Sequence, residues 1–273
     1  MKNREPLFLF IVALALYLVT MSISLDDRDG VQFALGIQDF NILRAQPHPP
    51  GYPIYILMGK FMFLFTRDEV LALTLTSALF AALSLVAFYY LILEMFDRQT
   101  AFYSAAVLGV TPLFWLNGLK AMTDIPAMFF MLVSLLFMYR NTTRKNIHYL
   151  YAAAFLTGLA MGIRLHTIFL LLPTLVYCLS KARAKQVATS TSLLVAGSLI
   201  WIIPLIAIHG AEKLLGAFLR QFTGRFTNDR VSILGAEFNP VYLWDRLWNF
   251  VEYFFLSYGI EPTLGIVILL AVL

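Results

Sequence analysis

The sequence has little charge and almost no cysteine. Only 13% of its 273 residues are Asp, Glu, Lys or Arg, and 60% are apolar, whereas about a quarter of the residues in soluble domains are charged. This composition excludes a soluble globular protein, a disordered chain, a collagen-like chain and a protein that reads nucleic acid. Cys178 is the single cysteine, so no internal disulfide can form, and no Cys and His residues have the spacing of a structural zinc site.

What the sequence has instead is a series of long apolar runs between short charged segments. The first run, residues 7–25, follows Lys2 and Arg4 and nearly spans a ~30 Å hydrocarbon core. A cleaved signal peptide is the alternative, but the length of the run favours an uncleaved anchor. The later runs are residues 51–65, 70–93, 101–116, 125–139, 149–162, 168–179, 187–208 and 248–273. The predicted fold class is all-α, a polytopic bundle of transmembrane helices with outer-face loops and interfacial helices.

The positions of basic residues decide how these runs cross the membrane. If residues 51–65 cross fully, the basic loop at 140–145 falls outside, against the tendency of Lys and Arg to stay in the cytoplasm. If they dip into the membrane or lie at its outer surface, the N-terminus, Arg98, residues 140–145 and residues 181–185 are all cytoplasmic. The second threading places nine of the twenty basic residues in short inner segments, and we adopt it.

Three segments then face outwards, and function is expected there. They are residues 26 to about 67, the turn at 120–124, and residues 209 to about 244. No internal repeat divides the chain, so residues 1–273 are predicted to form one transmembrane domain. The chain stops inside the apolar run 265–273, which favours a sequence that is incomplete at its C-terminus.

The first outer segment opens with Asp26, Asp27 and Asp29, directly after a predicted membrane helix. One interpretation is helix capping, because a carboxylate accepts hydrogen bonds from the first backbone N–H groups of a helix. The other is a general base or a metal ligand at the membrane surface, because a carboxylate can take a proton from an attacking hydroxyl or hold a divalent ion. The residues themselves leave both open.

The same segment closes with Gln46-Pro-His-Pro-Pro-Gly-Tyr-Pro. Its prolines and glycine predict a rigid turn that holds His48 in place. An isolated histidine is often an ordinary hydrogen-bonded residue. A fixed imidazole at a membrane face is also suited to contact a phosphate or a carboxylate.

These two motifs resemble the first outer loop of GT-C membrane glycosyltransferases, above all the protein O-mannosyltransferase and aminoarabinose transferase groups. The resemblance rests on Asp29-Gly-Val-Gln-Phe-Ala-Leu-Gly and the Pro-His-Pro-Pro turn, and continues through Thr111-Pro-Leu-Phe-Trp, Met122-Thr-Asp-Ile-Pro-Ala and Gly158-Leu-Ala-Met-Gly-Ile-Arg. It covers roughly residues 7–180. Relatives often have an Asp-Glu pair where this chain has Asp29 and Gly30, and the aminoarabinose branch tends to carry Lys where this chain has His48.

The resemblance implies an enzyme that takes a sugar from a polyprenyl-phosphate carrier. Asp29 matches the essential acidic residue of the first loop and is expected to be the catalytic base, while Asp124 matches a second acidic site and is expected to orient the acceptor. Cations would stabilise the negative charge on the departing phosphate. His48, Arg164 and Lys120 are therefore expected to bind the donor phosphate. The need for a divalent metal ion stays open, with Asp29 and Asp124 as its candidate ligands. The structural alternatives are that Asp124 only caps a helix and that Arg164 only anchors the chain at the membrane interface.

The third outer segment carries a helical stripe of Leu and Phe side chains from position 214 to position 226, interleaved with basic residues. This pattern predicts an amphipathic helix that rests on the headgroups. A structural role is the simpler interpretation. The functional hypothesis is that Arg220 or Arg225 helps to receive the anionic carrier lipid.

The predicted function is therefore that of an integral membrane glycosyltransferase of the cell membrane, with its active site on the outer face. Its partners would be a polyprenyl-phosphate sugar donor, membrane lipids and a protein or glycolipid acceptor. The main alternative is a transporter or flippase of a lipid-linked anion, which would place its charges near the bilayer midplane. A third is a non-catalytic assembly subunit, which would have no need of Asp29.

The threading can be tested by cysteine accessibility. After Cys178 is replaced, single cysteines at positions 29, 124 and 225 are expected to react with a membrane-impermeant thiol reagent in intact cells. Cysteines at positions 98, 144 and 183 are expected to react only after the membrane is opened. Labelling at position 144 in intact cells would overturn the threading.

Overall fold

The computed structural model describes residues 4–25, 27–227, 240–256 and 260. Within these residues the chain forms α-helices and one 3-10 helix and no strand, which confirms the predicted all-α class. The elements are α1 (Glu5–Thr20), α2 (Arg28–Gln38), η1 (Ile42–Arg44), α3 (Pro53–Thr66), α4 (Glu69–Met95), α5 (Arg98–Val110), α6 (Pro112–Leu119), α7 (Asp124–Arg144), α8 (Ile147–Met161), α9 (Thr167–Ser180), α10 (Ala184–His209), α11 (Ala211–Thr227) and α12 (Pro240–Leu256).

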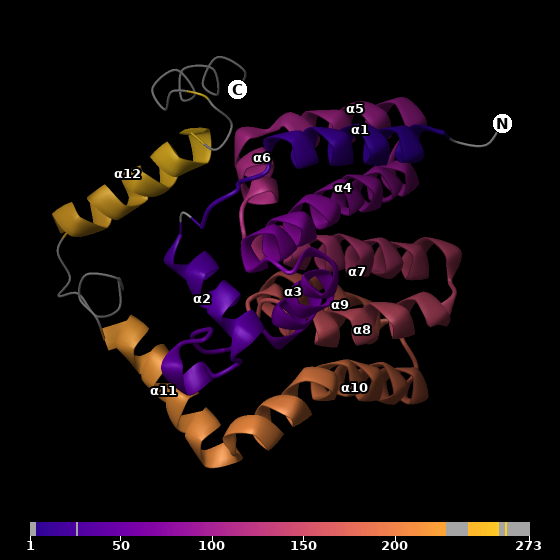
Figure 1. Cartoon of the computed structure of the whole chain (residues 1–273). Helices are drawn as coiled ribbons and strands as arrows, with labels where there is room; N and C mark the ends of the chain where they lie inside the picture. Colours follow the sequence, from indigo (N-terminus) through magenta and orange to yellow (C-terminus); the bar gives the residue numbers. More distant parts are fainter. Residues whose placement is uncertain (1–3, 26, 228–239, 257–259, 261–273) are drawn as a thin grey trace.

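The long helices lie side by side as a bundle (Figure 1). The helix α4 packs against α1, α5 and α7, and α8 packs against α7, α9 and α10. Among the described helices, α4, α7 and α10 are long and apolar enough to cross a membrane, while α1, α3, α8 and α9 are shorter apolar helices. Together with the low charge, these helices show an integral membrane protein.

Charged side chains gather where the long helices end. Arg98 Nε lies 2.8 Å from Glu5 Oε2, and Arg140 and Arg144 both pair with Glu94. These pairs join the start of α1, the α4–α5 connection and the α7–α8 connection at one end of the bundle. The segments predicted to be cytoplasmic therefore share one end, and the side of the membrane that this end faces stays a prediction.

The helix α3 does not run the length of the bundle. Its first turn is attached to the end of α8, where the Ile54 N–H donates to the Gly162 carbonyl oxygen at 3.0 Å. Gly59, further along α3, packs against Leu73 in the first turns of α4. Both contacts are at the end of the bundle where α2 and α11 lie (Figure 1). This agrees with the threading in which residues 51–65 do not cross the membrane.

The apolar run 101–116 is not one straight helix as the sequence suggested. The helix α5 ends at Val110, α6 begins at Pro112, and the two are bent by 62°. Proline has no N–H to continue the helix and forces the preceding residue, Thr111, into an extended conformation. The Tyr17 hydroxyl donates to the Gly109 carbonyl oxygen at 2.8 Å, in the last turn of α5, where carbonyl groups lack helical partners.

Two other runs also differ from their predicted extent. The first helix ends at Thr20, before the end of the run 7–25. The last run, 248–273, falls partly in α12, and most of it lies outside the described residues.

Glycine allows α8 and α10 to pack closely. A Cβ atom on Gly158 would lie 2.1 Å from the Leu194 carbonyl oxygen, and one on Gly197 would lie 2.3 Å from the Phe155 carbonyl oxygen. The Trp201 Nε1–H then donates to the Gly158 carbonyl oxygen at 2.9 Å. Such small-residue contacts let helix backbones approach in a membrane, where no hydrophobic effect drives helices together.

Gly158→Leu is expected to destabilise the protein by at least about 1–3 kcal/mol, because the obstructing atoms are backbone and cannot rotate away. Thermal unfolding in detergent would measure it. Gly216→Ala on α11 is the control, since the nearest atom to a Cβ there is 3.7 Å away, at the end of the Arg220 side chain. Equal unfolding temperatures for the two variants would contradict the proposed close contact.

Candidate functional site

One face of α2 carries the first group of candidate site residues. Asp29, Gln32, Phe33 and Gly36 have the spacing i, i+3, i+4 and i+7, so their side chains share a face. A Cβ atom on Gly36 would lie only 2.9 Å from Pro47 Cδ. The glycine therefore allows the proline-rich turn to pack directly on α2 and brings His48 to Asp29 and Gln32.

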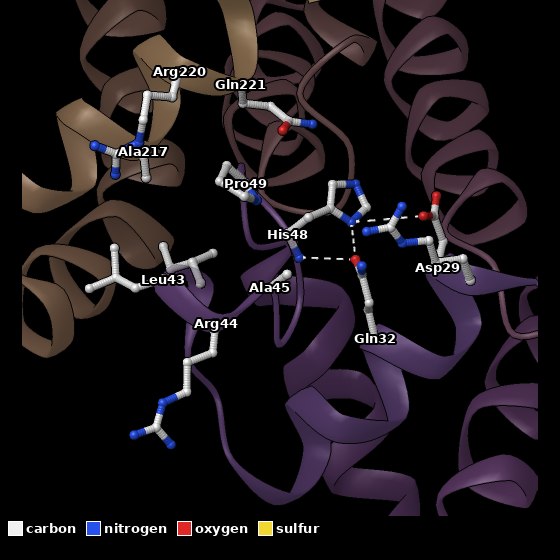
Figure 2. A pocket seen from close by; sticks show the side chains of 12 residues that line it. Asp29, Gln32, Leu43, Arg44, Ala45, His48, Pro49, Ala217, Arg220 and Gln221 are labelled. Atoms are coloured by element: carbon white, nitrogen blue, oxygen red, sulfur yellow. Dashed lines mark hydrogen bonds and ion pairs between the residues drawn. The ribbon is translucent and has the colours of Figure 1, made fainter. Parts of the chain in front are cut away.

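His48 has a polar partner on each side of its ring, and Figure 2 shows the side that faces Gln32 and Asp29. Its Nδ1 lies 2.5 Å from Gln32 Oε1 and 3.8 Å from Asp29 Oδ1, and its Nε2 lies 2.8 Å from the Tyr52 hydroxyl. The amide and carboxylate oxygens both accept, so they favour the tautomer in which Nδ1 carries the proton. The side chain of His48 is only 12% exposed, whereas that of Asp29 is 46% exposed. The hydrogen bond of His48 is therefore with Gln32, and the Asp29 carboxylate lies beside the imidazole at an accessible surface.

The segment between α2 and α3 is attached to α10 by His209, a buried residue at the end of that helix. The Ile42 N–H donates to His209 Nε2 at 3.2 Å, and His209 Nδ1 lies 3.2 Å from the Leu205 carbonyl oxygen. Within the segment, the backbone groups of Asn41 and Gln46 bond each other in both directions. These bonds fix η1 beside the His48 turn.

A cavity of about 630 Å³ opens between α2, the η1 segment and α11. Asp29, Gln32 and His48 line it, together with three arginines, Arg28, Arg44 and Arg220 (Figure 2). Arg44 makes an exposed ion pair of 3.7 Å with Asp39, and exposed pairs of this kind contribute little. The lining thus has three guanidinium groups and one carboxylate, an excess of positive charge that suits an anion, and Figure 2 shows the Arg44 side chain directed away from Asp29 and His48.

The second acidic residue, Asp124, lies at the first position of α7. Its Oδ2 accepts from Arg164 Nη1 at 2.7 Å, and the same nitrogen donates to the Thr123 hydroxyl at 3.1 Å. The sequence suggested a cap for a helix beginning at Ile125, but α7 begins at Asp124 itself and Thr123 is the N-cap. The Asp124 carboxylate therefore forms an ion pair with Arg164. Arg164 thus contacts the protein as well as the membrane interface at which it was expected.

An ion pair between Lys120 and Asp27 links the turn at 120–124 to the start of α2. Lys120 Nζ lies 3.3 Å from Asp27 Oδ2, and Asp27, although at the N-cap of α2, makes no capping hydrogen bond with its side chain. A Cβ atom on Gly30 would lie 3.5 Å from the Ala121 carbonyl oxygen, so the turn that leads to Asp124 packs on the start of α2. Asp29 and Asp124 are therefore on adjoining elements at the same end of the bundle.

Tyr55 lies beneath these elements and is fully buried. Its ring packs edge-on against Phe33, with 5.0 Å between the centroids. Burial raises the pKa of the Tyr55 phenol well above its usual range, and the negative charge of Asp124 adds to the increase. The phenol is therefore a neutral part of the support for the site.

The predicted site residues form three separate acid–base pairs, Asp29 with His48, Asp27 with Lys120 and Asp124 with Arg164. Lys120 and Arg164 thus have carboxylate partners of their own, and their predicted contacts with a donor phosphate stay predictions. Arg225 is in α11, but its side chain lies outside the described part of the chain. Among the described residues, no three His, Cys, Asp or Glu side chains gather as ligands for a metal ion, and we derive no step through one.

Sequence reasoning missed four residues of this site: Gln32, Tyr52, Arg28 and Arg44. The spacing of Gln32 three residues after Asp29 was a usable signal, because it puts both on one helix face. The hydrogen bond between Tyr52 and His48 is set by the path of the proline-rich turn, which the sequence did not specify.

Residues 47–208, more than half of the chain, match the family described as dolichyl-phosphate-mannose-protein mannosyltransferase. The chain belongs to this family. No curated protein and no solved structure matches it. Membership confirms the resemblance noted in the sequence and establishes a membrane glycosyltransferase that uses a lipid-linked sugar donor.

The matched range, residues 47–208 of this glycosyltransferase, includes some residues of the site and leaves out others. His48, Lys120, Asp124 and Arg164 lie inside the matched range, whereas Asp29 and Arg220 lie outside it. The roles of Asp29 and Arg220 therefore depend on the geometry of the cavity that they share with His48.

His48→Ala is expected to raise the apparent KM for the lipid-linked donor by roughly tenfold or more, the scale of a lost hydrogen bond to a charged group. His48→Lys is expected to raise it less, because an ammonium group can still meet a phosphate. His148→Ala, on α8, is the control. Equal donor KM values for wild type and His48→Ala would reject the predicted contact between His48 and the donor phosphate.

Proposed function

We propose that the protein transfers a sugar from a polyprenyl phosphate to an acceptor hydroxyl at the outer face of the cell membrane. The observation that carries this proposal is the cavity that Asp29 lines together with Arg28, Arg44 and Arg220. Family membership supplies the class of reaction and the lipid-linked donor. The orientation follows from the positive-inside rule applied to residues 98, 140–145 and 181–185.

The three arginines would bind the donor phosphate. A guanidinium group meets two phosphate oxygens through parallel N–H bonds and keeps its charge at any physiological pH. Arg220 comes from α11, whose first turns carry apolar side chains against α10. A carrier lipid could therefore place its phosphate in the basic cavity and its chain along α11.

Asp29 would act as the general base. The acceptor oxygen forms a bond to the first carbon of the sugar, its proton passes to the Asp29 carboxylate, and the bond between that carbon and the phosphate oxygen breaks. The bonding electrons leave with the polyprenyl phosphate, whose added charge the arginines stabilise.

The distribution of charge favours this function over transport of a lipid-linked anion. A transporter would need charges near the bilayer midplane. In the part of the chain that the structure describes, every ion pair lies at one end of the bundle or the other. A non-catalytic subunit would retain the fold without needing Asp29, and the next experiment separates it from an enzyme.

Asp29→Asn is expected to lower sugar transfer by roughly 10²–10⁴-fold, because an amide cannot accept the proton. The same change should alter stability by at most ~1 kcal/mol, because Asp29 is in the first turn of α2 and the interaction of a charged side chain there with the helix dipole is of that size. The measurements are transfer in membranes, membrane abundance and thermal stability.

Asp97→Asn is the matched control, because Asp97 caps α5 through the Thr100 N–H at the other end of the bundle. It is expected to retain full transfer. Near-normal transfer by well-folded Asp29→Asn protein would reject Asp29 as the base and direct attention to Asp27 or Asp26.

A further inference from the structure

A narrow groove lies between α3 and the last turns of α10. Its volume is about 220 Å³, below the ~300–1,000 Å³ of cavities that enclose a whole small molecule. The groove is therefore suited to part of a chain that continues outside the protein.

The walls of the groove are apolar stripes of the two helices. The lining residues of α3 are at positions 53, 54, 56, 57 and 60, and those of α10 are at positions 200, 201, 204, 205 and 208, so each set follows one side of its helix. Leu57 is 61% exposed and Ile208 is 59% exposed. Because both helices belong to a membrane bundle, these apolar side chains are suited to contact lipid chains.

Lys60 is the one charged residue in the lining of the groove and in residues 53–66 of the sequence. It is half-buried, and within the described residues it makes no ion pair and no hydrogen bond. A lysine at a membrane interface can extend its ammonium group to water. Lys60 differs in that its side chain lines an apolar groove with room for a ligand, so the groove combines one cation with a hydrocarbon surface.

We propose that this groove binds an anionic phospholipid of the bilayer, with its phosphate at Lys60 and part of one acyl chain between α3 and α10. Lysine binds phosphate as a point charge, and a phospholipid carries the phosphate and the apolar chain on one molecule. Polyprenyl phosphate has the same two parts, but the cavity suited to its phosphate has three arginines and shares no lining residue with the groove. The phospholipid would be a structural ligand and not a substrate.

The groove adjoins the contacts that attach the outer segment to α10. Phe40 lines it, and the Phe40 ring packs edge-on against His209 with 5.8 Å between the centroids. His209 accepts from the Ile42 N–H, the bond that holds η1 beside the proline-rich turn. A lipid in the groove would therefore contact α3, α10 and the outer segment in their folded arrangement, and so would stabilise that arrangement.

Thermal unfolding of the full chain, washed free of lipid in a neutral detergent, tests the ligand. Added phosphatidylglycerol is expected to raise the unfolding midpoint by a few degrees, because a ligand that binds only the folded state stabilises it. Phosphatidylcholine, whose head group has no net charge, and inorganic phosphate, which has no chain, are expected to leave the midpoint unchanged. An equal increase with either of them, or no increase with phosphatidylglycerol, would overturn the proposal.

Variants of Lys60 test the position of the lipid. In Lys60→Gln the phosphatidylglycerol concentration that gives half of the increase is expected to rise about tenfold, the scale of a lost hydrogen bond between charged groups. Lys60→Arg keeps the cation and is expected to keep the wild-type value. Lys213→Gln, which removes an exposed lysine of α11, is the matched control and is also expected to keep it. An unchanged value in Lys60→Gln, or an equal rise in Lys60→Arg or Lys213→Gln, would overturn the contact between Lys60 and the phosphate.

The carrier lipid is distinguished by the same measurement. Polyprenyl phosphate is expected to change the midpoints of wild type and Lys60→Gln equally, because its phosphate is assigned to the cavity with three arginines. An effect of polyprenyl phosphate that is lost in Lys60→Gln would assign the groove to the carrier and overturn the bilayer phospholipid.

Discussion

An ionised side chain in the hydrocarbon interior of a bilayer is costly, and the rest of this structure follows from that constraint. The described ion pairs lie at the two ends of the bundle, and the middle is built from small and apolar residues such as Ala78, Ala81 and Ala82 of α4. One end holds charges that join helix connections. The other end holds the candidate site residues Asp29 and Asp124 with their partners His48 and Arg164, so the candidate site lies at a single end of the bundle.

At that surface, the site is held by elements that do not cross the bundle. The helix α2 presents Asp29 and Gln32 on one face, and the proline-rich turn is packed against that face at Gly36. His48 then bonds Gln32 on one side and Tyr52 on the other. His209 attaches the same segment to α10 through the Ile42 N–H. These contacts hold the α2 face and the proline-rich turn in a fixed arrangement, which is the kind of positioning that the proposed role of Asp29 requires.

The cavity beside α11 differs in charge from a second cavity, which lies between α6, α7 and α9. The first is lined by three arginines and one aspartate, whereas the second is largely apolar and also has Asn117, Asp124, Arg164 and His166 in its lining. The turn at 120–124, which leads to Asp124, packs on α2 at Gly30. The elements that carry Asp29 and Asp124 are therefore in contact.

The sequence by itself determined the helical membrane class, the shared end of residues 98 and 140–145, and the identity of Asp29, His48 and Asp124 as site candidates. It could do so because apolar length, charge placement and a short motif are local properties of the chain. Only the tertiary structure decided that Lys120 pairs with Asp27, that Arg164 pairs with Asp124, and that Arg28, Arg44 and Arg220 share a cavity with Asp29. These partners come from separate elements: Lys120 is in the turn before α7, Arg164 is between α8 and α9, and Arg220 is on α11. The physical reason is that such pairs and cavities depend on how distant elements pack, which no local pattern encodes.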